Sequence, residues 1–206
     1  MPTTTFFNLP KEKQEAIFEA ATKEFSRVSF HDASINQMIM NAGISRGSFY
    51  MYFKDKADLY HYLVQMYQKK LEQRFITVLK DHQGDLIDTY LALFQMVVRK
   101  MQVDKERSFF EKIILNVNFR NDPVLNHHEK KAFMITEMLS LFDKRPLNIT
   151  SDEELLEVID LIHMLFIHSL VKVLKGRVDV AAATSTYQRQ LIILKEGLYH
   201  HKEEKK

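Results

Sequence analysis

The sequence predicts an all-α protein, and three observations support this prediction. Apolar residues recur at spacings of three and four through successive segments of the chain, which is the period of an α-helix. The 206 residues include only 5 glycines and 4 prolines, too few for a turn-rich β protein. The stretch Leu155–Leu174 is apolar on nearly all sides, as expected for a helix that is buried on more than one face.

Three short helices are expected near the N-terminus. The first covers Lys11–Ser26 and carries an apolar stripe at helical spacing. Ser34 then caps a short helix over 35–41. Gly43 forms the turn that follows, because glycine reaches positive φ without a Cβ clash. A third helix is expected over Ser45–Tyr52, with a serine at its N-cap position.

The third helix and the residues after it carry groups that suit a nucleic-acid contact. The stretch from Asn41 to Leu59 reads NAGISRGSFYMYFKDKADL. Its hydroxyls, phenols and cations are the groups that reach phosphate oxygens and base edges. Phe49 and Phe53 lie four residues apart, so they share one face of this helix and are expected to pack inward. Gly47 is a poor helix former in a first turn, so its presence needs a reason, and close approach of the backbone to a partner is one.

This stretch resembles the DNA-binding signature of the TetR family of bacterial transcriptional regulators. The residues that carry the resemblance are Ala42, Gly43, Ile44, Ser45, Arg46, Gly47, Phe49, Tyr50, Tyr52, Phe53, Lys56 and Leu59. Many fixed spacings agree at once, and the likeness covers roughly the first third of the chain. The remainder matches only in length and helical character.

The resemblance implies two domains. Residues 1–55 would form a three-helix, helix-turn-helix DNA-binding domain. Residues 56–206 would form a larger helical domain for ligand binding and dimerisation. The arm at Pro2–Pro10 could dock on the first domain or lie near DNA, and we favour docking.

The resemblance also implies which residues contact DNA. Arg46 is the best candidate for direct readout, with guanine as its expected partner, because the N-terminal part of a recognition helix reads bases. Ser34 and Gln37 would project from the N-terminus of the preceding helix, where backbone N–H groups favour a phosphate. With these and the neighbouring hydroxyls and cations, the full predicted set is Ser34, Gln37, Ser45, Arg46, Gly47, Ser48, Tyr50, Tyr52, Lys54 and Lys56. The net charge of +2 is weak support for DNA binding, so the argument depends on the local cluster of cations. An ordinary helical hairpin with exposed polar residues is the alternative.

The rest of the chain predicts further helices. They cover Lys56–Asp81, Asp85–Val103, a segment from Asp104 or Lys105, a segment from the break at 121–123 to Asp143, Ser151–Lys175 and Val178–His200. Ser151 and Glu154 form a capping box, and Gly176 is a natural C-cap. The resemblance implies that the last two helices form a homodimer through a four-helix bundle.

Methionine and phenylalanine side chains on the central helices are candidates for an adaptable apolar pocket. Plain core packing is the more ordinary interpretation of any one of them. The candidate liners of an effector pocket are Tyr90, Phe94, Met101, Phe110, Ile114, Met134, Met138 and Phe166. A pocket of this kind would take a hydrophobic small molecule.

Several classes of function are excluded or disfavoured. The absence of cysteine excludes disulfides, thiolate metal sites and cysteine nucleophiles, and it fits a cytoplasmic protein. We see no signal peptide and no apolar run of about 18 residues for a membrane span. The pairs His127–His128 and His163…His168 have spacings that suit one metal or haem poorly, so we predict no metal site and no cofactor. No nucleophile–base set appears, so we predict no catalytic residue and no enzyme.

The resulting hypothesis is a TetR-type, ligand-responsive transcriptional regulator. It would bind a double-stranded DNA operator as a homodimer, and a repressor is favoured over an activator. A hydrophobic small molecule would release it from the operator. Two alternatives stay open: a ligand carrier whose helix-turn-helix no longer reads DNA, and a helical enzyme with a buried apolar site.

Overall fold

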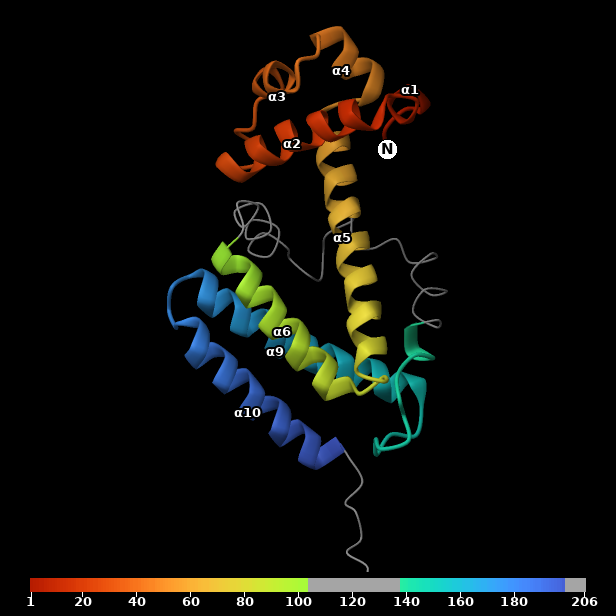
Figure 1. Ribbon diagram of the computed structural model, residues 1–206, viewed down its shortest axis with the longest axis vertical. Coiled ribbons are helices and arrows are strands. Elements are labelled where there is room, and N and C mark those ends of the chain that lie inside the picture. The colour runs from red at the N-terminus through yellow and green to blue at the C-terminus, as the bar shows by residue number, and fades with distance from the viewer. Residues whose placement is uncertain (104–137, 199–206) are drawn as a thin grey trace, which may run out of the picture. The chain divides into compact units, whose positions relative to one another are not determined.

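All regular elements that the structure describes are helices. The computed structural model describes residues 1–103 and 138–198 (Figure 1). Its helices are α1 (Thr4–Phe7), α2 (Lys11–Arg27), α3 (Ile35–Ala42), α4 (Arg46–Tyr52), α5 (Lys56–Asp81), α6 (Leu86–Val103), α9 (Asp152–Leu174) and α10 (Val180–Leu198). The prediction of an all-α fold is therefore confirmed.

The described residues form two compact units. The first contains residues 1–71, and the second contains residues 72–103 together with 138–198. Helix α5 contributes residues to both units, since the division falls after Leu71. The division into domains 1–55 and 56–206 stays a prediction.

The ends of the short helices are formed by the residues that the sequence indicated. The Ser34 hydroxyl accepts a hydrogen bond from the Gln37 N–H at 3.4 Å and caps α3. Gly43 ends that helix at φ +64°, a left-handed conformation that suits glycine. The Ser45 hydroxyl accepts from the Ser48 N–H at 3.0 Å and caps α4. These local contacts build the helix–turn–helix of α3 and α4.

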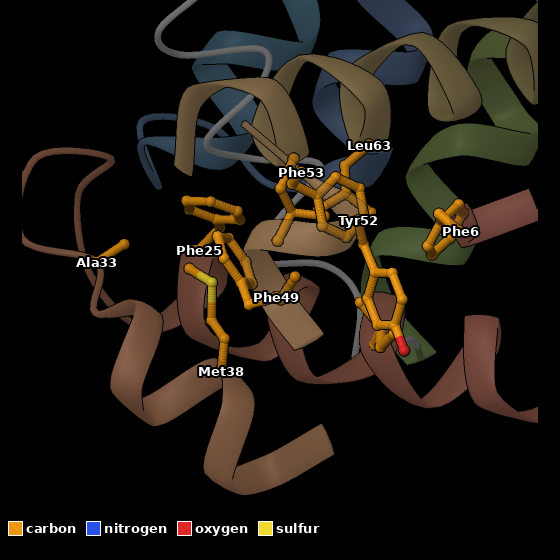
Figure 2. Close-up of a cluster of buried hydrophobic side chains, with 11 residues drawn as sticks. Phe6, Phe25, Ala33, Met38, Phe49, Tyr52, Phe53 and Leu63 are labelled. Carbon is orange, nitrogen blue, oxygen red and sulfur yellow. The ribbon is translucent and has the colours of Figure 1, made fainter. Parts of the chain in front are cut away.

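Aromatic side chains dominate the core of the first unit (Figure 2). Phe49 and Phe53 are 1% and 0% exposed, which confirms that they pack inward. Phe6, from the N-terminal arm, is also fully buried in this cluster. The arm therefore docks on the domain, as favoured, and part of it is helical as α1.

In the second unit, α10 packs against α6 and α9, and α6 packs against α9 (Figure 1). The Ser151 hydroxyl caps α9 by accepting from the Glu154 N–H at 3.2 Å. The Glu154 carboxylate accepts from the N–H and hydroxyl of Thr150, one residue before the position that a capping box uses. Gly176 follows the helix at φ +64°, as expected near a C-cap.

Two predicted helix ends differ from the structure. Helix α10 begins at Val180 and not at Val178, because the Asp179 carboxylate caps it by accepting from the Ala182 N–H at 2.7 Å. The helix expected to reach Asp143 leaves helical geometry after Leu139. The Leu141 N–H bonds back to the Met138 carbonyl in a tight turn, and the Asp143 N–H donates to the Gly84 carbonyl at 3.0 Å. This pairing with Gly84 is incompatible with a continued helix. The helix expected from Asp104 or Lys105, and most of the one expected after 121–123, lie outside the described residues.

No helix within residues 1–103 and 138–198 has the length and apolarity needed to cross a lipid bilayer.

Candidate nucleic-acid interface

Arg46 lies in the first turn of α4, and two hydrogen bonds fix the direction of its side chain. The Arg46 side chain is exposed, and its Nη1 donates to the Asn36 Oδ1 at 2.6 Å. Its Nη2 donates to the Tyr50 hydroxyl at 3.4 Å, and its guanidinium carbon lies 5.6 Å from the Tyr50 ring centroid. Arg46 is thus held between α3 and α4, with its remaining N–H donors available for a partner.

Asn36 is a residue that the sequence interpretation missed. It is exposed in the first turn of α3, and its only sequence signal is that it is polar and lies two residues after a predicted N-cap. Its contact with Arg46 joins the two helices of the helix–turn–helix on their exposed side. It therefore helps to fix the direction of the Arg46 side chain.

The fold does not itself require glycine at position 47. A Cβ built on Gly47 would meet only the Ser45 hydroxyl, at an ordinary 3.7 Å. No described atom crowds this position, so packing within the described residues does not explain a poor helix former here. Close approach of a nucleic-acid backbone is one explanation.

Three predicted contact residues gather around one open depression. Ser34, Arg46 and Lys56 line it, together with Ala33, Ile35 and Asn36. The N-terminus of α3 opens here, so backbone N–H groups and two cations face the same space. An anionic group such as a phosphate suits these surroundings.

Lys56 also holds the loop before α3. Its ammonium donates to the carbonyls of His31 at 2.9 Å and Ala33 at 2.8 Å. It lies 5.0 Å from the Phe30 ring centroid, which adds a cation–π contact. The side chain is half-buried, and one of its three N–H donors is left after the two carbonyls.

The other predicted contacts differ in exposure. Tyr50 is 45% exposed, whereas Tyr52 is only 7% exposed and packs its ring toward Phe6 at 6.2 Å between centroids. Lys54 is exposed, and Gln37 and Ser48 are half-buried. Tyr52 is thus mainly a core residue in the free protein, and its role in DNA contact stays a prediction.

A buried carboxylate of α2 holds the residue that caps α3. Glu24 is 1% exposed, and its Oε1 accepts from the Ser34 N–H at 2.9 Å. Its two oxygens also accept from the Arg27 guanidinium at 2.8 and 3.0 Å. The hydrogen bonds from Arg27 and the Ser34 backbone, with the positive charge of Lys56, hold the pKa of Glu24 below its ordinary value despite burial. The sequence showed Glu24 only as a charge at the edge of an apolar stripe.

Replacing Glu24 by glutamine is expected to destabilise the protein by about 1–3 kcal/mol at pH 7, because the Arg27 guanidinium and the Ser34 N–H lose a charged acceptor. The folded-state pKa is lowered, so this stabilisation is present above the unfolded pKa, about 4.3, and is lost as pH falls through the folded value. Urea unfolding at pH 7 and at about pH 3.5 should show a smaller pH dependence in the variant. The same substitution at the exposed Glu19 of α2 is the control. Equal losses at both positions would contradict the assignment.

Aromatic side chains also gather in the second unit, where effector residues were predicted. Tyr90, Phe94 and Met101 are buried, and Phe166 and Met138 are half-buried. The Phe94 ring lies 5.5 Å from Phe166, and the Tyr90 ring lies 6.3 Å from it, between centroids. The structure thus brings Tyr90, Phe94 and Phe166 together. The other three candidates, Phe110, Ile114 and Met134, lie outside the described residues.

Two residues that the sequence interpretation did not select belong to this aromatic cluster. Tyr187 is fully buried at 4.5 Å from Phe94, and its hydroxyl makes no hydrogen bond to a described residue. Burial and the neighbouring Tyr90 raise its pKa above the ordinary range. His163 stacks on Phe166, and burial lowers its pKa, which favours the neutral ring. Across the described ranges, no three His, Cys, Asp or Glu residues converge to hold a metal ion.

Two family models match this chain. The description "Bacterial regulatory proteins, tetR family" matches residues 17–63, which include α3 and α4. The description "Tetracyclin repressor-like, C-terminal domain" matches residues 85–198, more than half of the chain. The chain belongs to the TetR family. The resemblance found in the sequence is confirmed, and it extends to the second unit.

Curated relatives match parts of this TetR-family chain. The "uncharacterized HTH-type transcriptional regulator YdgC" of Bacillus subtilis is 26% identical over 98 residues, which are 46% of this chain and 50% of the relative. The chain thus matches about half the length of that relative.

Solved TetR-family structures share the fold. A regulator from Chloroflexus aurantiacus is 23% identical at a TM-score of 0.51, covering 98% of this chain and 100% of the other. A regulator from Streptomyces coelicolor is 15% identical at a TM-score of 0.65, covering 92% and 97%. At these identities the likeness supports the TetR-type fold alone.

Proposed function

We propose that the protein is a ligand-responsive transcriptional regulator that binds a double-stranded DNA operator through α3 and α4. The observation that carries the proposal is Arg46, which is exposed on the first turn of α4 and oriented by Asn36 and Tyr50. An arginine fixed in this way can donate two parallel hydrogen bonds to O6 and N7 of guanine. Membership of the TetR family supports the same function.

In this proposal α4 enters the major groove and the surrounding groups hold the DNA backbone. Ser34, Gln37 and the N–H groups at the start of α3 bind one phosphate, next to the remaining donor of Lys56. Ser45, Ser48, Tyr50 and Lys54 supply further backbone contacts, and Gly47 permits close approach. Tyr52, the last residue of α4, would contact a phosphate.

The operator would be bound by a homodimer, because TetR regulators act as dimers. We assign the dimer contact to α9 and α10. Each of these helices exposes large apolar side chains in the single chain: Leu161 and Met164 are 49% and 58% exposed, and Ile192 and Ile193 are 47% and 64% exposed. Apolar surface of this kind is stabilised by burial against a second copy. Two recognition helices would then meet successive major grooves about 34–36 Å apart.

The effector would be a hydrophobic small molecule bound in the second unit, near Tyr90, Phe94 and Phe166. A repressor of this type works in the bacterial cytoplasm and leaves its operator when the effector binds. The coupling between the two ligands must be reciprocal, so DNA weakens effector binding by the same factor. Binding, not catalysis, is the proposed activity.

The test begins with selection of duplexes from a random pool on the wild-type protein, followed by fluorescence anisotropy of the selected duplex over a salt series. Tight binding that falls steeply with salt and survives excess competitor DNA is expected. A protein that selects no sequence and shows no salt-dependent DNA binding would instead support a ligand carrier with the same fold.

Replacing Tyr50 by phenylalanine is expected to weaken binding to the selected duplex by about 2- to 10-fold, because one hydroxyl hydrogen bond is lost. Replacing Lys56 by alanine is expected to lower the salt slope by about 1, as for one phosphate contact. Lys80 is an exposed lysine of the second unit, and Lys80→Ala is the control for loss of charge. Wild-type affinity at both positions 50 and 56 would refute the proposed contact surface.

A further inference from the structure

The N-terminal arm contacts the C-terminal end of α4, the proposed recognition helix. Thr3 occupies the N-cap position of α1, yet its hydroxyl makes no capping bond to that helix. It donates instead to the Met51 carbonyl at 2.6 Å, and the Thr3 N–H donates to the Tyr52 carbonyl at 2.9 Å. Both acceptors belong to the last turn of α4.

These two bonds fall where a helix lacks its own donors. The last four carbonyls of an α-helix have no intrahelical partner. In α4, which has only 7 residues, the carbonyls of Met51 and Tyr52 find their partners in Thr3. A helix this short has little stability of its own and depends on such outside contacts.

An aromatic contact fixes the same end of α4. Phe6 of α1 is fully buried, and its ring lies 5.0 Å from Phe53 and 6.2 Å from Tyr52 between centroids. The Phe6, Tyr52 and Phe53 side chains lie in one cluster in Figure 2. Phe7, the next residue, is 48% exposed, so the arm inserts one ring and leaves its neighbour at the surface.

We propose that Thr3 and Phe6 are positioning residues for operator recognition. They hold the C-terminal end of α4, and because α4 has only 7 residues, a shift at that end also moves its first turn, where Arg46 lies. The arm acts through α4 and does not itself contact DNA. This inference rests on the proposed function, since it concerns how the same interface is kept ready to bind.

The decisive substitution is Thr3→Val, which keeps the shape of the side chain and removes the donor hydroxyl. Thr5→Val is the matched control, because Thr5 is exposed on the same helix α1. Thr3→Ser restores a hydroxyl and should restore the wild-type behaviour. Phe6→Leu and Phe7→Leu form a second pair that separates the buried ring from the exposed one.

Two measurements are made on the full chain. Hydrogen exchange without DNA is expected to be faster for the amides of residues 50–53 in Thr3→Val than in Thr5→Val, with other helices unchanged. Affinity for the duplex selected on the wild-type protein is expected to fall about 3- to 10-fold, the effect of one hydrogen bond. Affinity for a scrambled duplex of equal length should stay the same, because it depends on cations that the substitution leaves in place.

Each other outcome overturns the inference. Equal operator affinity in Thr3→Val and Thr5→Val would mean that the arm does not affect recognition. Weaker operator binding with unchanged exchange in α4 would mean that the arm contacts DNA directly. A wild-type protein that selects no duplex would overturn the proposed function, and the exchange comparison would still decide whether Thr3 holds α4.

Discussion

Replacing Arg46 by alanine is expected to weaken binding to the selected operator by about 5- to 150-fold, since a bidentate contact to a base provides about 1–3 kcal/mol of discrimination. The folded protein should lose little stability, because the side chain is exposed and its partners Asn36 and Tyr50 are solvated without it. Anisotropy on the selected duplex and on its single-base variants measures the effect. The loss should be concentrated at one base position of each half-site.

Arg46→Lys is the informative control for this prediction. Lysine keeps the positive charge but has no planar fork, so it cannot replace a bidentate arginine. If Arg46 reads a base, both variants should lose discrimination at the same position, while the lysine variant keeps the wild-type salt slope. If the lysine variant instead binds every duplex as the wild type does, Arg46 is only a phosphate contact and the assignment of base readout is wrong.

The caps of α3 and α4 could be predicted because they depend on neighbours in the sequence. Ser34, Gly43 and Ser45 act within three or four residues of where they stand. The same holds for α5, whose observed bounds are the predicted Lys56–Asp81, set by residues at its own ends. Local hydrogen bonding and glycine conformation suffice for such elements.

The interface contacts could not be predicted in the same way. Asn36 and Arg46 are ten residues apart on different helices, so their contact depends on how α3 and α4 cross. Thr3 and Met51 are 48 residues apart, and nothing in the sequence pairs them. Glu24 looked like an edge charge, but it lies under the Ser34 backbone and is buried there. Each of these features is decided by tertiary packing rather than by local preference.

A tertiary contact also ended the helix before Asp143. Leu141 and Phe142 fit the apolar spacing of a continuing helix, which is why the sequence predicted one. The chain turns instead, and Phe142 becomes buried while the next N–H pairs with Gly84. Here one backbone pairing outweighs an apolar pattern that is otherwise consistent with helix.

Replacing Gly84 by alanine is expected to destabilise the second unit by about 2–5 kcal/mol, the sum of left-handed strain and overpacking. Gly84 has φ +82°, and a Cβ there would lie 2.5 Å from the Leu141 carbonyl oxygen and 2.6 Å from the Asp143 nitrogen. Both are backbone atoms, so no side chain can rotate to relieve the clash. Any shift would also break the hydrogen bond from the Asp143 N–H to the Gly84 carbonyl. Urea unfolding followed by circular dichroism measures the loss.

Gly176→Ala separates strain from clash. Gly176 has φ +64°, but a Cβ added there would meet no described atom within 4 Å, so its replacement should cost only the left-handed strain, about 1–2 kcal/mol. Equal losses at the two glycines would show that the Leu141–Asp143 backbone moves away easily.

Because the proposed dimer contact is also in the second unit, operator affinity of Gly84→Ala should fall with its stability as temperature rises. The Gly176 variant should keep its operator affinity over the same range, since its smaller loss leaves the second unit folded.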